Sequence, residues 1–378
     1  MMTNTKKIAI VGAGVAGMAL AILATRQGHH VSLFERVSNV SSMGAGVTLW
    51  PNAMFVMQKM GLDKKVMQVG GTPCMMRQFD RHGLPQTEFD ISAVNSLCGF
   101  PSVTVLRREL MGLLAGALES LGKEITFNCS ITAADVMKLS REFDLVVGAD
   151  GRMNSVVRQA LCAEKITPHY HGFVNVIGVG RQREGMLNNA IDDYRGQGER
   201  FGIVPVNDGW CYWAGAWKAP VDDEHLRAHW CDELHRRFRD WPDPVQNVLL
   251  SYDRASVNCI FVHDIDPLPF WHQDNVLIIG DAAHASLPTS GQGACQALED
   301  AWHLTRLLKE TDNLEIALQS FYQLRHIKTS AAQLVGRQFA RKIFSEQPEQ
   351  PEPLLPASTI SAAELSRFWM QGLTPLDS

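Results

Sequence analysis

The sequence predicts an α/β fold: a Rossmann-like dinucleotide-binding domain, an antiparallel β-sheet domain inserted into it, and C-terminal helices. Three stretches predict this arrangement. The chain opens with a strand, a glycine-rich turn and a helix in "KKIAIVGAGVAGMALAILATRQ". Short strands rich in aromatic residues and glycine, such as "FVNVIGVGR" and "WCYWAGAW", dominate about 168–270. At 275–310 a strand, a glycine-rich loop and a helix appear again, so the chain is expected to return to its first domain.

The expected domain boundaries follow these changes of pattern. The nucleotide-binding domain is expected in three parts and the sheet domain in two, before a proline- and glutamate-rich linker. In chain order, the predicted pieces are nucleotide-binding residues 1–70, a sheet-domain hairpin at 71–100, nucleotide-binding residues 101–167, the substrate domain at 168–270, nucleotide-binding residues and helices at 271–345, and the linker with a last short helix at 346–378.

Four further predictions concern secondary structure. "EITFNCSITAA" (124–134) reads as a strand and 106–121 as an amphipathic helix. A single helix, at about 222–240, is expected to interrupt the inserted strands. Two helical stretches are expected at about 313–345.

Composition excludes several classes of partner. Of the 378 residues, 46% are apolar, enough for a sizeable core, and the net charge is -5 without a long basic run, so no nucleic acid is expected. The eight cysteines include no CxxC pair, which favours free thiols in a reducing cytoplasm over a metal site. Lys6, Lys7 and the apolar run to Ala24 imitate a signal peptide, but regularly spaced glycines fit a binding turn better. No membrane span is expected, and a homodimer is possible.

The first glycine turn has the form G-x-G-x-x-G at Gly12, Gly14 and Gly17. It follows a strand and opens a helix, where the first glycine permits a tight turn, the second admits a pyrophosphate and the third lets helix and strand pack closely. Glu35 ends the next strand, where a carboxylate accepts hydrogen bonds from ribose hydroxyls and repels a 2′-phosphate. These residues predict a dinucleotide site but leave NAD and FAD open.

Two later motifs bear on that choice. "GADG" lies at Gly148–Gly151, within "DLVVGADGRMNSVVR", and "GDAAHASLPTSGQG" lies at Gly280–Gly293. With the opening turn, and in this order around an aromatic sheet domain, they resemble the flavin-dependent monooxygenases with the para-hydroxybenzoate hydroxylase fold, the class A aromatic hydroxylases. The resemblance covers most of the chain to about residue 330. It implies a tightly but non-covalently bound FAD.

The resemblance also assigns roles to single residues. Asp281 is expected to hydrogen-bond the ribityl chain, and the helix starting in "GQGAC" to face the pyrophosphate and the flavin N1–O2 edge. Pro288 is expected beside the isoalloxazine with its carbonyl toward the substrate. The other cofactor contacts that we expect are Ala16, Arg36, Gly46, Thr48, Arg107, Ile131, Asp150, Gly291, Gln292, Gly293, Ala294 and Cys295.

Some of these residues have plainer interpretations. Asp150 is expected to contact the cofactor directly or through water, or else to cap its own turn. Arg107 is either a cofactor ligand or a surface arginine. His284 is expected to be a satisfied turn histidine and not a catalytic one. Arg152 or Arg158 lies near the path of the nicotinamide cofactor, or else on the surface.

The chemistry that the resemblance implies is oxygen insertion. NADH or NADPH, bound transiently, reduces FAD, and O2 then gives a C4a-hydroperoxyflavin that hydroxylates an aromatic or heteroaromatic small molecule. Arg200 and Tyr212 are predicted to meet across a hairpin at Asn207–Gly209, with Arg200 holding an anionic or carbonyl-bearing substrate and Tyr212 orienting or deprotonating it. The alternative interpretation is a surface arginine and a packing tyrosine. Strand alternation places Tyr212 on the face of Trp210, opposite to Trp213.

Other activities stay open at this point. The same fold performs Baeyer–Villiger oxidation, epoxidation or antibiotic inactivation in other members, and a flavin-binding redox sensor without turnover is a further alternative. The G-W-x-W-x-I-P signature of flavin halogenases does not occur in the sequence.

Overall fold

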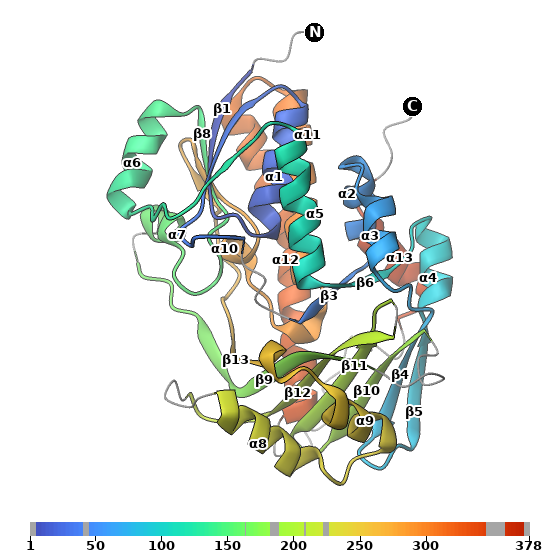
Figure 1. Cartoon of the computed structure of the whole chain (residues 1–378). Coiled ribbons are helices and arrows are strands. Elements are labelled where there is room, and N and C mark those ends of the chain that lie inside the picture. The colour runs from blue at the N-terminus through green and yellow to red at the C-terminus, as the bar shows by residue number, and fades with distance from the viewer. Residues whose placement is uncertain are drawn as a thin grey trace.

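The computed structural model describes residues 5–40, 45–162, 164–181, 189–207, 209–221, 227–344 and 360–373. Two layers of sheet make up the molecule, one above the other in Figure 1. A short antiparallel ribbon of β3 (Gly46–Leu49) and β6 (Val103–Leu106) lies between them. The predicted fold class, an α/β nucleotide-binding domain with an inserted sheet and C-terminal helices, is confirmed.

The upper layer is a six-stranded sheet in the order β14-β15-β8-β1-β2-β7. Neighbouring strands are parallel except for β14 and β15. The strands are β14 (His272–Gln273), β15 (Val276–Ile278), β8 (Leu145–Gly148), β1 (Lys7–Val11), β2 (His30–Phe34) and β7 (Ile125–Thr126). Because β1, β8 and β15 are adjacent and parallel, the three glycine-containing motifs that follow them meet at the carboxyl ends of these strands.

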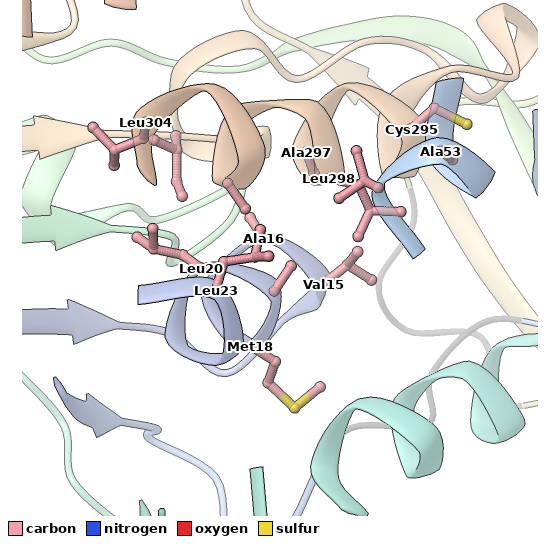
Figure 2. Close-up of a cluster of buried hydrophobic side chains, with 14 of the residues drawn as sticks. Val15, Ala16, Met18, Leu20, Leu23, Ala53, Cys295, Ala297, Leu298 and Leu304 are labelled. Atoms are coloured by element: carbon pink, nitrogen blue, oxygen red, sulfur yellow. The ribbon is translucent and has the colours of Figure 1, made fainter. Parts of the chain in front are cut away.

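Helix α1 (Val15–Arg26) is buried on almost every side, because small and aliphatic residues surround its axis. It packs against α11 (Gly293–Glu310), with Ala16, Leu20 and Leu23 facing Ala297, Leu298 and Leu304 in Figure 2. The other helices of this layer are α5 (Arg107–Ser120), α6 (Ala133–Glu142), α7 (Val156–Leu161) and α10 (Asp281–His284). The first and third motifs are therefore held on two helices that share one core.

The lower layer is a seven-stranded sheet in the order β13-β9-β12-β11-β10-β4-β5. Only the pair β10 and β4 is parallel among its neighbours. The strands are β13 (Asn258–Asp264), β9 (His169–Arg181), β12 (Trp210–Lys218), β11 (Glu199–Pro205), β10 (Ala190–Gly196), β4 (Met75–Asp80) and β5 (Pro85–Asp90). The hairpin β4–β5 thus extends the inserted sheet, although it lies a hundred residues earlier in the chain.

The two faces of this sheet differ. On the outer face, Trp213 and Trp217 are buried against α8 (Arg227–Phe238) and α9 (Asp243–Ser251), which cover the sheet from below in Figure 1. The inner face, which carries Tyr212, turns toward the nucleotide-binding layer. The predicted alternation of Tyr212 and Trp213 is confirmed. The two buried tryptophans belong to the core between the sheet and helices α8 and α9.

Three predictions of secondary structure are wrong. Only Ile125–Thr126 of the stretch 124–134 is a strand, because Asn128 takes φ 54° and a capping box of Thr132 and Asp135 then starts α6. Helix α9, which begins after Pro242, was not predicted. The stretch expected as two helices is the single α12 (Leu314–Phe344), which continues through Gly336.

The remaining helices lie on the flank of the molecule. These are α2 (Pro51–Lys59), α3 (Asp63–Val69), α4 (Ile91–Cys98) and α13 (Ala362–Met370). Trp369 of α13 packs on Trp50 just before α2, with ring centroids 4.9 Å apart. The final helix is therefore attached to the domain, whereas most of the predicted linker falls outside the described residues.

Candidate flavin and substrate site

The opening turn has the shape that a bound diphosphate requires. Gly12 has φ 104°, and a Cβ there would lie 2.4 Å from the carbonyl oxygen of Ala149. A Cβ on Gly17 would lie 1.9 Å from the Gly12 carbonyl oxygen, whereas one on Gly14 would meet nothing within 4 Å. Internal packing therefore demands glycine at two positions, and the third leaves open space at the N-terminus of α1, where free N–H groups favour an anion.

Glu35 is fixed beside this turn. Its Oε2 accepts a hydrogen bond from the Ala13 amide at 2.8 Å, and its Oε1 accepts one from Val37 at 3.2 Å. Next to it, Arg36 is exposed, and Ile131 is half-buried against the domain core. The carboxylate is thus held at the end of β2, beside the open space at Gly14.

A cluster of charges joins the second and third motifs. Arg152 approaches the Asp281 carboxylate at 3.3 Å. Burial lowers the pKa of Arg107, the charge of Asp281 raises it again and that of Arg152 lowers it. Arg107 is therefore not a free surface arginine but lies with Arg152 and Asp281, where α5 begins and the two motifs meet.

Asp150 caps a helix. Its carboxylate accepts hydrogen bonds from Ser155 Oγ and from the Val156 amide, both at 2.6 Å, at the start of α7. Burial raises its pKa, and these hydrogen bonds counteract the shift. The backbone of Asp150 also borders the first turn, because a Cβ on Gly12 would lie 2.9 Å from its Cα.

Arg158 is 1% exposed, so it is neither a surface arginine nor accessible to a nicotinamide cofactor. Its guanidinium donates hydrogen bonds to the carbonyl oxygens of Ala282 at 2.9 Å and Arg152 at 2.6 Å. It ties the second motif to the third from inside the domain. The side chain of Arg152 is 29% exposed and is the more accessible of the two.

The loop from Pro288 to Gly293 turns into α11 through Gly291, which has φ 64°. Trp50 Nε1 donates to the Gly291 carbonyl oxygen at 2.9 Å. Side chains of Gln292 and Cys295 are buried, while Gly293 and Ala294 are half-buried. Gln292 and Cys295 therefore offer a ligand their main-chain groups and not their side chains.

A buried ionic network that the sequence reasoning missed lies beneath this loop. His284 and Asp300 are 2.6 Å apart, and Asp300 also binds the Gly280 amide and Arg325, each at 2.8 Å. Burial opposes the ionisation of Asp300, but the charges of His284 and Arg325 hold its pKa at about 2. Lys328 binds the neighbouring Glu299 at 2.9 Å. His284 is thus a satisfied structural histidine, as expected.

A signal for this network existed in the sequence. Glu299 and Asp300 lie between the apolar pairs Ala297–Leu298 and Ala301–Trp302, and Arg325 and Lys328 stand three residues apart in the next helix. Buried charges of this kind need partners, but spacing alone does not say which.

Tyr212 connects the inner sheet face to the nucleotide-binding layer. A Cβ on Gly46 would lie 2.0 Å from the Tyr212 ring, and the Tyr212 hydroxyl is 2.8 Å from Thr48 Oγ1. Burial raises the pKa of Tyr212 above its ordinary value, which keeps the hydroxyl protonated near neutral pH. A protonated hydroxyl can orient a substrate by hydrogen bonding but cannot act as the base that deprotonates it.

Arg200 and Tyr212 do not meet as cross-strand partners. The register of β11 and β12 places Arg200 opposite Ala216, and Tyr212 opposite Val204. The two side chains share the inner face, but they lie four residues apart along it. The prediction that they meet across the hairpin is therefore corrected, because the residue that pairs with Tyr212 is Val204, which lies nearer to the turn than Arg200 does.

The comparisons with known proteins agree with this architecture. The family model described as "FAD binding domain" matches residues 5–313. The chain belongs to the FAD-dependent monooxygenases of the aromatic hydroxylase type. Aurachin C monooxygenase/isomerase of Stigmatella aurantiaca is 31% identical over 333 residues, which cover 84% of both chains. An FAD-dependent urate hydroxylase of Klebsiella pneumoniae is 28% identical over 330 residues, 83% of this chain and 84% of that protein.

Solved structures of this family share the fold. Klebsiella pneumoniae HpxO complexed with FAD and uric acid has a TM-score of 0.79 and 25% identity, covering 90% of this chain and 89% of that one. The tetrameric form of 2-methyl-3-hydroxypyridine-5-carboxylic acid oxygenase has a TM-score of 0.74 and 23% identity, covering 96% of each chain. Among the described residues, no helix of this family member is long and apolar enough to cross a membrane.

Proposed function

We propose that this family member is a single-component monooxygenase that hydroxylates an anionic aromatic or heteroaromatic small molecule. The observation that carries the proposal is the contact of Tyr212 with Gly46 and Thr48, because it brings the inner sheet face against the motifs expected to hold FAD. The names of the relatives support this class of substrate, since they include urate and 6-hydroxynicotinate enzymes.

The described residues fit FAD. The open space at Gly14, the fixed Glu35 carboxylate and the cluster of Arg107, Arg152 and Asp281 provide an anion site, a ribose acceptor and polar groups at one sheet edge. Bound FAD would supply the redox chemistry, in which hydride from NADH or NADPH and one O2 give a hydroxylated product and one water molecule. The main-chain N–H groups at the start of α11 would stabilise negative charge at the flavin edge.

Residues of the inner face bind and orient the substrate. Arg200 pairs with an anionic group, and the protonated Tyr212 hydroxyl holds the ring in register with the flavin. Pro288 closes the site from the side of α11.

The eight cysteines are all free thiols, which supports a reducing cytoplasm as the compartment in which the enzyme acts.

The test is substrate-stimulated oxidation of NADH or NADPH by the purified yellow holoprotein. Uric acid, 6-hydroxynicotinate and 3-amino-4-hydroxybenzoate form the panel. At least one is expected to accelerate NAD(P)H oxidation and to yield a product one oxygen atom heavier by mass. FAD-loaded protein that responds to none of them contradicts this hydroxylase proposal. An oxygenated product with an opened or expanded ring shows a different oxygen insertion.

A further inference from the structure

Two arginines share one carboxylate on the inner sheet face. Asp193 lies on β10 opposite Gly202, and its side chain is 5% exposed. Its Oδ1 accepts a hydrogen bond from Arg200 Nε at 2.5 Å, and its Oδ2 binds Arg195 Nη2 at 2.7 Å. The three side chains together carry one net positive charge at this site.

The hydrogen bond from Arg200 leaves the rest of its guanidinium available. Arg200 donates to Asp193 through Nε, and no described residue accepts a hydrogen bond from Nη1 or Nη2 of Arg200. A Cβ on Gly202 would lie 3.6 Å from Arg200 Nη2. The side chain therefore extends along β11 over Gly202, in the direction of Val204 and of Tyr212 opposite it. The charge of Arg200 also lowers the pKa of Tyr212, against the larger effect of burial.

We propose that Asp193 is a positioning residue that fixes Arg200 for the binding of an anionic ring substrate. The inference rests on the proposed function, in which Arg200 binds that substrate. A flexible arginine loses rotamer freedom when it binds a ligand, and an anchored one has already lost it. Arg195 balances the charge of Asp193, so the anchor does not cancel the attraction of Arg200 for an anion.

Electrostatics alone predict the opposite effect of removing Asp193. Loss of a carboxylate beside Arg200 makes the site more positive, so an anion is expected to bind more tightly if charge alone matters. If the anchor matters, binding weakens in the order wild type, Asp193→Asn, Asp193→Ala, because asparagine keeps a hydrogen-bond acceptor and alanine does not. The sign of the change separates the two explanations.

The adjacent residue is a matched control. Asp192 lies on the same strand, is similarly buried and binds Arg77 at 2.8 and 2.9 Å. Its cross-strand neighbour is Ile203, whose side chain belongs to the outer core. Asp192→Asn therefore removes a similar ion pair from the opposite face of the sheet.

The experiment compares the holoprotein with Asp193→Asn, Asp193→Ala and Asp192→Asn. Flavin absorbance changes on titration with uric acid and 6-hydroxynicotinate give Kd, and steady-state kinetics separate KM from kcat. We expect Kd and KM to rise by roughly tenfold or more in Asp193→Ala and less in Asp193→Asn, at unchanged FAD content. Asp192→Asn is expected to stay within about twofold of wild type.

Crystal structures of Asp193→Ala and wild type give a second readout. Arg200 is expected in its wild-type position only when Asp193 is present. An ordered, unmoved Arg200 in Asp193→Ala, or binding as tight as wild type, overturns the proposal. Loss of FAD in both Asp193 variants also overturns it, since it shows a general structural role. Failure of wild type to bind either probe counts against the proposed substrate class, and the position of Arg200 then decides the role of Asp193.

Discussion

The first glycine turn and the inner sheet face achieve specificity in different ways. In the turn, backbone atoms approach so closely that Gly12 and Gly17 tolerate no side chain. On the inner face, the polar groups are single side chains such as Arg200 and Asp193, which come from different strands. The first region binds through main-chain shape and the second through side-chain placement, so substitutions at Gly12 and Gly17 should affect folding, whereas those at Arg200 and Asp193 should affect ligand binding.

The largest expected effect is at Gly17. Gly17→Ala places a Cβ 1.9 Å from the Gly12 carbonyl oxygen, so the opening strand, turn and helix cannot form as they are and the protein is expected to lose its fold and FAD. Gly14→Ala is the matched control, because a Cβ there meets nothing within 4 Å. We expect the Gly14→Ala apoprotein to have the same urea midpoint of unfolding as the wild-type apoprotein. Its affinity for FAD is expected to fall by roughly tenfold or more. Equal stability losses in both variants would contradict the division of roles.

The buried network beneath the third motif gives the next largest effect. Arg325→Met leaves Asp300 and Glu299 without their shared cation, and the free energy of unfolding is expected to fall by about 3–5 kcal/mol. The control is Arg306→Ala, which removes a helix-surface pair with Glu310 and should cost only about 0.3–0.5 kcal/mol. Urea unfolding of both variants checks this. A loss below about 1 kcal/mol in Arg325→Met would show that the loop does not depend on the network.

The contact between the layers is tested by a double-mutant cycle. Gly46→Ala is expected to be harmful because its Cβ would overlap the Tyr212 ring, and Tyr212→Ala removes that ring. The double variant should therefore be more stable than the sum of the single effects by about 1–3 kcal/mol. Thermal or urea unfolding of the four proteins measures this coupling. Strict additivity means that the two residues do not touch in solution.

The smallest expected effect concerns acid stability. Burial, followed by the charges of Arg325 and its neighbours, lowers the pKa of His303 to about 2. The unfolded chain takes up a proton near pH 6.5 and the folded chain does not, so stability is full above that pH and falls as the pH drops toward 5, by about 2 kcal/mol. His303→Gln should flatten this slope in urea unfolding at pH 7 and 5, whereas His30→Gln, at an exposed position, should keep it. An unchanged slope in His303→Gln rules out this source of acid sensitivity.

Most of the nucleotide-binding half was accessible to sequence reasoning. Its signals are local: the spacing of Gly12, Gly14 and Gly17, and the two later motifs, each lie within about fifteen residues. The errors also have local causes. A capping box at Thr132 was not recognised, and the stretch 313–345 was divided into two helices although it forms the single α12. The buried ionic network was missed because its members come from separate helices.

By itself, the sequence determined the fold class and the family of this protein, and it selected Arg200 and Tyr212 as residues of interest. These conclusions depend on backbone constraints and residue order, which short stretches of chain express directly. Only the tertiary structure decided that Tyr212 reaches Thr48, that Arg158 is internal and that Asp193 holds Arg200. The physical reason is that a side chain's partner depends on which elements pack together and, within a sheet, on the register of the paired strands, and spacing along the chain specifies neither.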